Sequence, residues 1–406
     1  MICNYLKFYN IRLKDYFVTN MTKTKKNTNF VPIMQHNTDV IEVKSRKDYR
    51  AFIGFPKQLY KDCSHYVPPM DGSELKTMTE HPALAFCEAR YWLAYRDGKV
   101  VGRIGGIINR KSNEMKNQKR IRFSWFDLID NLEVAQALVH VVEEWGAQEG
   151  LTEICGPSRF SNLEKQAMLV EGFDVTPSIC ADYNYPYYPK LLEQLGFEKE
   201  VEYVQYKMKV ETFPPRFAEL AERLSQRYHV RLRTSKTKEQ LRKSGKEFFA
   251  VLNESYANIF NFIPLTEAEI EWAIKDFFQF ADPSLASILE DDHGRLVGFA
   301  FCLPSLSEAF RKAKGKILPF GWYHVLKALR KNDKVDMYLT GVLPEYKNSG
   351  IHLIYHKQLQ DTFIERGYQY AIASQQLEDN KAVNIWQRYD SELLCRRRCY
   401  KKDIKP

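Results

Sequence analysis

A repeated order of elements constrains the fold of this sequence more than any other feature. Residues 90–109, "RYWLAYRDGKVVGRIGGIIN", alternate apolar and other residues on both sides of an Asp-Gly pair, a pattern typical of a β-hairpin. Residues 284–303, "SLASILEDDHGRLVGFAFCL", repeat this pattern around a His-Gly pair, and Gly102 and Gly298 occupy the same place in the two hairpins. The chain therefore predicts two similar halves.

The same further elements follow each hairpin. A basic stretch leads to a strand that starts at Arg120 in one half and at Lys334 in the other. Residues 131–150 and 350–367 then place apolar side chains at three- and four-residue spacing, and each run ends at a glycine, as amphipathic helices do. A short strand, a helix and a last strand complete each half. We expect an α/β (α+β) fold made of two tandem domains, with mixed sheets flanked by helices.

The predicted boundaries follow from local composition. Pro214-Pro215 separates a first domain, residues 34–212, from a second domain, residues 213–406. Residues 1–33 are polar and lysine-rich in their second part, and we expect them to be a disordered or extraneous tail.

Bulk composition excludes several classes of protein. Of the formal net charge of +9, the tail carries more than half, so the body has an ordinary solvated surface and nothing indicates a nucleic acid partner. No stretch approaches the roughly 20 apolar residues of a membrane span, and no secretory signal is present. We expect a soluble, cytoplasmic protein. The eight cysteines form no zinc-type pair, and we assign no metal.

The stretch "LTGVLPEYKNSGIHLIYHKQL", residues 339–359, runs from a strand through a glycine-containing turn into a helix. Backbone N–H groups at such a helix start can bind a phosphate. Gly350 would allow close approach, and Lys347 would add a charge. The alternative is a surface turn in which Ser349 caps the helix. Both interpretations stay open on these residues alone.

The order of elements around this turn resembles the GNAT acyltransferase superfamily, in which the loop Gln/Arg-x-x-Gly-x-Gly/Ala binds the pyrophosphate of acyl-CoA. Lys347, Gly350 and His352 stand in the three positions of that loop. Lys keeps the charge of the first position, whereas His replaces a small residue in the third. The first half has no glycine in its corresponding turn and carries Asp127, Asp130 and Glu133 around it.

The resemblance also implies a site for acetyl-CoA or a longer acyl-CoA as co-substrate, and catalytic residues near it. Tyr389 would protonate the departing thiolate. Asp336 and Tyr338 are candidates from the sequence itself, because they alternate on the strand before the loop and could face the cleft as a base or hold a water. Each of the three could instead be a packing or solvated side chain, and Asn380 could be a helix cap. The cofactor-binding residues implied are Leu339, Thr340, Gly341, Val342, Lys347, Asn348, Ser349, Gly350, Ile351, His352 and Asn380.

A more specific resemblance covers the first half. The passage "GPSRFSNLEKQAMLVEGFDVTPSICADYNYPYYPKLLEQLGF" resembles bacterial tandem GNAT-like proteins, some of them related to bacterial ceramide synthases. Its polar residues would line an acceptor pocket between the halves, or form structural turns. These candidate substrate-binding residues are Asn162, Glu164, Asp174, Tyr183 and Asn184.

Together these features predict an acyl-CoA-dependent N-acyltransferase that acts on a small-molecule or lipid amine, with a long-chain sphingoid base as the sharpest candidate. A lipid acceptor would bring the protein into peripheral contact with a membrane. Two other functions stay open. His352 could fill the phosphate site of a non-catalytic GNAT-fold ligand-binding or scaffold protein, and an aminoacyl-tRNA-dependent transferase would require a basic groove between the halves.

Overall fold

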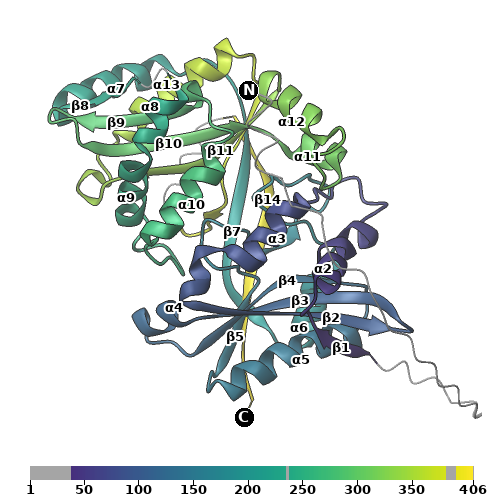
Figure 1. Cartoon of the computed structure of the whole chain (residues 1–406). Coiled ribbons are helices and arrows are strands. Elements are labelled where there is room, and N and C mark those ends of the chain that lie inside the picture. Colours follow the sequence, from purple (N-terminus) through teal and green to yellow (C-terminus); the bar gives the residue numbers. More distant parts are fainter. Residues whose placement is uncertain (1–37, 235–236, 381–389, 406) are drawn as a thin grey trace, which may run out of the picture. The chain divides into compact units, whose positions relative to one another are not determined.

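The computed structural model describes residues 38–234, 237–380 and 390–405, and Figure 1 shows the arrangement of their helices and strands. Residues 38–406 form one compact unit. The predicted tail, residues 1–33, lies outside the described residues.

The first half contains the predicted elements in the predicted order. Strands β2 (Cys87–Arg96) and β3 (Lys99–Asn109) form the hairpin, whose turn residues Asp97 and Gly98 both have positive φ. The other elements are β1 (Asp39–Glu42), α2 (Arg46–Leu59), α3 (Asp71–Glu80), η1 (Pro82–Ala85), α4 (Arg110–Met115), β4 (Arg120–Leu128), α5 (Leu132–Gln148), β5 (Glu153–Gly156), β6 (Met168–Glu171) and α6 (Tyr187–Gln194).

The second half repeats this order with additions. Its hairpin is formed by β9 (Ala286–Asp291) and β10 (Leu296–Pro304). The basic stretch that follows folds into two helices, α11 (Ser307–Ala313) and α12 (Gly321–Arg330). The other elements are α7 (Pro215–Tyr228), β8 (Val230–Leu232), α8 (Lys238–Lys243), α9 (Gly245–Ser255), α10 (Glu267–Phe277), η2 (Pro283–Leu285), β11 (Lys334–Val342), η3 (Pro344–Tyr346), α13 (His352–Glu365), β12 (Tyr370–Ile372) and β13 (Gln376–Leu377).

The last strand of each half lies in the sheet of the other half. Strand β7 (Glu198–Lys209) pairs with β12, and β14 (Ser391–Asp403) pairs with β5. These two long strands also pair with each other, so the described strands join in a single mixed sheet in the order β1-β2-β3-β4-β5-β14-β7-β12-β11-β10-β9-β8. In Figure 1 they cross the middle of the molecule side by side. The division into residues 34–212 and 213–406 stays a prediction about the sequence repeat.

Each half has its own apolar core, and each core uses the exchanged strand. The first core extends from Tyr60 to Phe197 and includes Cys395 and Tyr400 of β14. The second core extends from Ala221 to Ala373 and includes Met208 of β7. Neither half therefore completes its core from its own segment.

The two equivalent hairpin glycines are needed for different reasons. A Cβ at Gly102 would lie 2.7 Å from Leu138 Cδ1, so its absence lets α5 pack closely on β3. A Cβ at Gly298 would lie 3.1 Å from Val342 Cγ1 of the neighbouring strand β11. The shared position reflects tight packing against a helix in one half and against a strand in the other.

The passage between β5 and α6 in the first half, residues 157–186, is called the extra segment below. Strand β6 within it pairs with β14. Two ion pairs hold the rest. Arg159 contacts Glu74 at 2.8 Å in a buried pair, and Lys165 contacts the half-exposed Asp182 at 2.7 Å. None of the described helices is long and apolar enough to cross a membrane.

Candidate functional site

The candidate site of the second half lies where β11 separates from β12. These strands pair only over Lys334, Val335 and Asp336, whereas β11 pairs with β10 as far as Val342. On the β12 side, the rest of β11 therefore has no strand partner among the described residues. The predicted residues 339–342 lie in this stretch, and Thr340 O accepts a hydrogen bond from the Tyr256 hydroxyl at 3.0 Å.

The turn after β11 places backbone groups at the start of α13. Asn348 and Gly350 have positive φ, of 66° and 86°. Ser349 Oγ accepts a hydrogen bond from the Ile351 N–H at 3.2 Å, but the N-cap position is Ile351 itself, and no described side chain caps the first turn. Lys347 is exposed. The helix N-terminus, with its partial positive charge, is therefore free of a side-chain cap.

The equivalent helix of the first half starts differently. Asn131 Oδ1 accepts a hydrogen bond from the Val134 N–H at 3.0 Å, and Arg96 donates to the same oxygen at 3.2 Å. Glu133 pairs with Arg96 in the first turn. Side chains thus occupy this helix start, and the acid at Glu133 disfavours an anion there.

His352 follows the turn, and its ring lies edge-on to the ring of His356, with centroids 5.8 Å apart. His356 lines a cavity together with Met337 of β11 and Leu359 of α13. Burial, with a smaller effect from His352, lowers the pKa of His356 to about 3, so His356 is neutral at physiological pH.

Asp336 is the most perturbed acid of the second half. Val335 and Met337 belong to the core that also contains Leu359 of α13, so Asp336 points to the opposite face of the sheet. Its side chain is only 4% exposed. Burial raises its pKa to about 7, and a hydrogen bond from Ser305 and the charge of Lys334 oppose this only in part. One carboxylate oxygen, Oδ2, has no hydrogen-bond partner in the described part of the chain.

Tyr338 lies two residues further along β11 and interacts with Cys180 of the extra segment. Burial raises the pKa of Tyr338 well above its ordinary value. The pKa of Cys180 is raised to about 11 by burial, with smaller effects from Tyr338, Asp336 and Lys165. Cys180 therefore lies within electrostatic range of Asp336 in the second half and of Lys165 in the first.

Comparison with known proteins adds to this geometry. Protein YghO of Escherichia coli is 27% identical over 370 residues, which cover 89% of this chain and 94% of that protein. The bacterial ceramide synthase of Caulobacter vibrioides is 28% identical over 367 residues, 87% of this chain and 94% of that protein. No family model matches the sequence.

A solved structure decides the fold. The tandem GNAT protein from the clavulanic acid biosynthesis pathway superposes on 91% of this chain and 99% of its own, with a TM-score of 0.55 at 11% identity. The chain has a tandem GNAT fold. The fold predicted from the repeat is thus confirmed.

Two predicted residues of the GNAT site lie at or beyond the edge of the described chain. Tyr389 falls in residues 381–389, outside the described residues. Asn380 is exposed, and its N–H donates to Leu377 O at 3.0 Å.

The five predicted acceptor residues have different surroundings. Asn162 donates to Phe260 O at 2.8 Å, across the two halves. Glu164 accepts the Phe160 N–H at 2.9 Å, and Asp174 is exposed. Both hydrogen bonds fit structural roles, and a role in substrate binding stays a prediction for these three residues.

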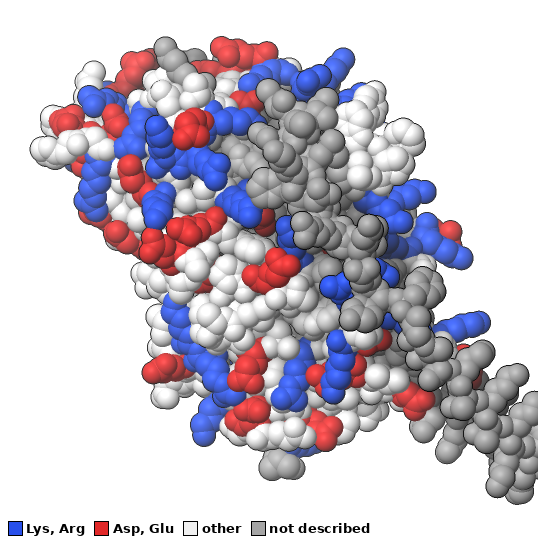
Figure 2. All heavy atoms as spheres, in the orientation of Figure 1, with Lys and Arg blue, Asp and Glu red and all other residues white. Residues whose placement is uncertain are grey.

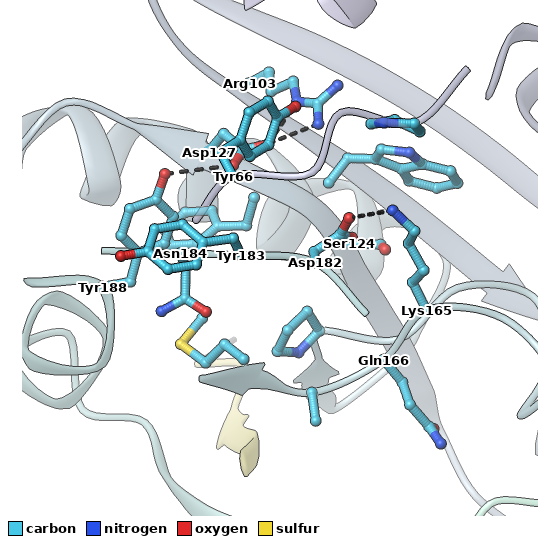
Figure 3. A pocket seen from close by; sticks show the side chains of 16 residues that line it. Tyr66, Arg103, Ser124, Asp127, Lys165, Gln166, Asp182, Tyr183, Asn184 and Tyr188 are labelled. Atoms are coloured by element: carbon cyan, nitrogen blue, oxygen red, sulfur yellow. Dashed lines mark hydrogen bonds and ion pairs between the residues drawn. The ribbon is translucent and has the colours of Figure 1, made fainter. Parts of the chain in front are cut away.

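Tyr183 and Asn184 line a cavity of the first half, which encloses about 560 Å³ including the space at its mouth. The cavity borders β4 at the place where this strand leaves β5, the counterpart of the β11 separation. Asn184 holds Leu169 through two backbone hydrogen bonds, of 2.6 and 3.0 Å. Figure 3 shows both side chains at the cavity.

Charged side chains also line this cavity. Arg103 pairs with Asp127 at 2.7 Å, and Lys165 pairs with Asp182 (Figure 3). Burial alone would raise the pKa of Asp182, but Lys165 and Arg159 outweigh it and hold the pKa well below its ordinary value. At neutral pH Asp182 is thus a carboxylate at the cavity, paired with Lys165. In the sequence, Asp127 stands out only as an acid beside the first-half turn, and no local pattern marks Arg103, Lys165, Asp182, Cys180 or Ser305 as site residues.

Proposed function

We propose that the chain is an acyl-CoA-dependent N-acyltransferase that binds acyl-CoA in its second half and transfers the acyl group to an amine. The observation that carries the proposal is Asp336, a buried carboxyl whose pKa is raised to about 7 at the point where β11 leaves β12. A general base is most effective when its pKa lies near the working pH.

The start of α13 fits the pyrophosphate of CoA. Among the described residues no side chain caps its first turn, and a Cβ at Gly350 would lie 3.2 Å from Leu224 Cδ1, so glycine leaves this turn uncrowded. The helix dipole and Lys347 would both favour a diphosphate there. In this proposal residues 347–352, with Asn380, hold the nucleotide end, and the backbone of residues 339–342 runs beside the acyl arm.

The proposed chemistry is direct transfer of the acyl group from the thioester sulfur to the acceptor nitrogen. The acceptor nitrogen attacks the thioester carbonyl carbon, the C–N bond forms, and the C–S bond breaks. Asp336 takes the proton that the nitrogen loses, and the sulfur leaves as a thiolate that is protonated to the CoA thiol. We assign that second proton to Tyr389, whereas Tyr338 would hold the acceptor or a water beside Asp336. Backbone N–H groups of residues 339–342 would polarise the carbonyl.

A long-chain sphingoid amine is the proposed acceptor. In support, the Caulobacter vibrioides relative is named a bacterial ceramide synthase, and the similarity extends over 94% of that protein. We place the polar end of the acceptor toward the extra segment, because Cys180 contacts the β11 site and Tyr183 and Asn184 line the neighbouring cavity.

Turnover of palmitoyl-CoA with a sphingoid base, followed by mass spectrometry of the amide, tests the proposal. Wild type should form the amide and release free CoA in equal amounts, and Asp336→Asn should lose nearly all activity while still binding CoA. Asp333→Asn, an exposed neighbour on the same segment, is the matched control and should keep activity. Amide formation by Asp336→Asn at the wild-type rate would show that Asp336 is not the base, and CoA binding without transfer to any amine would favour a binding protein.

A further inference from the structure

The two helices that connect β10 to β11 carry a surface unlike the rest of the described chain. The equivalent connection in the first half contains only the short helix α4. The α11–α12 hairpin, residues 307–331, is therefore an addition to the second half that the acyl-transfer proposal does not use.

Four large apolar side chains of the hairpin face solvent within six residues. Phe320 is 71% exposed, Leu318 57%, Tyr323 52% and Trp322 39%. Trp322 Nε1 donates to Pro319 O at 2.8 Å, so its one polar group is already satisfied. Elsewhere in the described residues the exposed large apolar side chains lie far apart in sequence, at Ile41, Met115, Leu132, Leu220, Leu232 and Ile364. A cluster of this kind marks an interaction surface.

Packing of the inner face of the hairpin keeps the four apolar side chains on its outer face. Val325 of α12 packs with Ala309 and Ala313 of α11 and with Met70 of the first half. Ser307 Oγ donates to Pro177 O at 2.7 Å, which ties α11 to the extra segment. The exposed side chains thus lie on the face opposite a packed interface.

The surroundings of the apolar cluster are strongly basic. Residues 307–331 hold seven Lys and Arg residues against a single acid, Glu308, which pairs with Arg311 at 2.6 Å. This segment alone accounts for a formal charge of +6, against +9 for the whole chain. Figure 2 shows uncharged surface over α12 with Lys and Arg side chains beside it. Within the described ranges, no acid forms an ion pair with the six other cations, which are Lys312, Lys314, Lys316, Lys327, Arg330 and Lys331.

We infer that the α11–α12 hairpin docks the protein on the surface of an anionic phospholipid bilayer. Trp and Tyr favour the headgroup region, whereas Phe320 and Leu318 suit the acyl boundary below it. The unpaired cations match the negative surface of such a bilayer, where each contributes about fivefold to binding. A nucleic acid would use the same cations but gain nothing from the protruding Phe320 and Leu318. This inference does not depend on the acyl-transfer reaction.

Sedimentation of the full chain with phosphatidylglycerol-rich vesicles, and with phosphatidylcholine vesicles, tests the inference. Wild type should bind the anionic vesicles more strongly, and salt should weaken that binding. Lys314→Glu with Lys316→Glu should reduce binding at least about 25-fold, because two cations are lost. Phe320→Glu should reduce it at unchanged cation number. The positions are exposed, so these variants should fold.

Two control variants match these changes elsewhere on the surface. Met115→Glu replaces an apolar side chain that is 56% exposed, and Lys119→Glu replaces an exposed lysine; both should leave vesicle binding unchanged. Quenching of Trp fluorescence by brominated acyl chains should disappear in Trp322→Phe while binding persists. Equal binding by wild type and the Lys314/Lys316 and Phe320 variants would overturn the inference. So would a gel-filtration dimer that Phe320→Glu converts to a monomer, or binding to a DNA duplex that needs the lysines but not Phe320.

Discussion

The buried carboxyl of Asp336 should cost the protein stability, and Asp336→Asn should recover it. The pKa of Asp336 rises from an ordinary value of 3.8 to about 7 in the native state. The unfolded chain releases this proton near pH 4, so above that pH the native state binds more protons and the free energy of unfolding falls as pH rises. The loss is complete above about pH 7, and three pKa units correspond to about 4 kcal/mol.

Asn cannot ionise, so Asp336→Asn does not lose this free energy of unfolding as the pH rises. We expect Asp336→Asn to raise the free energy of unfolding by about 2 to 4 kcal/mol near pH 8, with part of the gain lost through the altered contact with Ser305. The gain should shrink by about 3 kcal/mol near pH 5, where native Asp336 is protonated. Urea denaturation of wild type, Asp336→Asn and the control Asp333→Asn at both pH values measures this. A variant less stable than wild type near pH 8 would refute the raised pKa.

Three further predictions concern the pH dependence of the reaction, the packing at Gly102 and the ion pair of Glu74. If Asp336 is the base, kcat/KM for amide formation should rise with pH through about 7 as the carboxyl loses its proton; a flat profile across that range would count against it. Gly102→Ala should destabilise the protein by about 1 to 3 kcal/mol in thermal unfolding, because its Cβ would meet Leu138, whereas Gly54→Ala, with open space inside α2, should be neutral or stabilising. Glu74→Gln should cost about 3 to 5 kcal/mol, because buried Arg159 then keeps only its longer ion pair with Asp182, at 3.4 Å. Glu198→Gln at an exposed pair should change stability by less than about 1 kcal/mol. Equal effects of the two Glu substitutions would contradict the buried pair.

The elements that sequence reasoning located are those defined by local signals. The strands and helices around Gly102, Gly298 and the 347–350 turn follow from periodicity and turn residues within each segment. The exchange of β7 and β14 could not be predicted in this way, because a strand has the same alternating pattern whichever neighbour it pairs with.

In the candidate site, too, local sequence patterns identified some residues, whereas their contacts come from distant segments. Asp336 and Tyr338 were candidates because they alternate on one strand, but their surroundings come from elsewhere in the chain. Cys180 contacts Tyr338 from the extra segment, and no local sequence pattern predicts that contact. Likewise the basic stretch after β10 was visible in the sequence, whereas its two helices and outward-facing Phe320 depend on packing against Met70 of the first half.

CoA binding at the start of α13 is the central claim, and isothermal titration calorimetry tests it most directly. A carboxylate about 5 Å from the diphosphate at an effective dielectric constant of about 20 would cost about 3 kcal/mol. Gly350→Asp should therefore weaken CoA and palmitoyl-CoA binding by about a hundredfold. Gly367→Asp is the matched control, since Gly367 also has positive φ, of 74°, but lies past the other end of α13 in open space. Saturable binding that Gly350→Asp weakens by this factor and Gly367→Asp preserves is the predicted result. Equal affinity in all three proteins, or no binding of any CoA by folded wild type, would contradict the account.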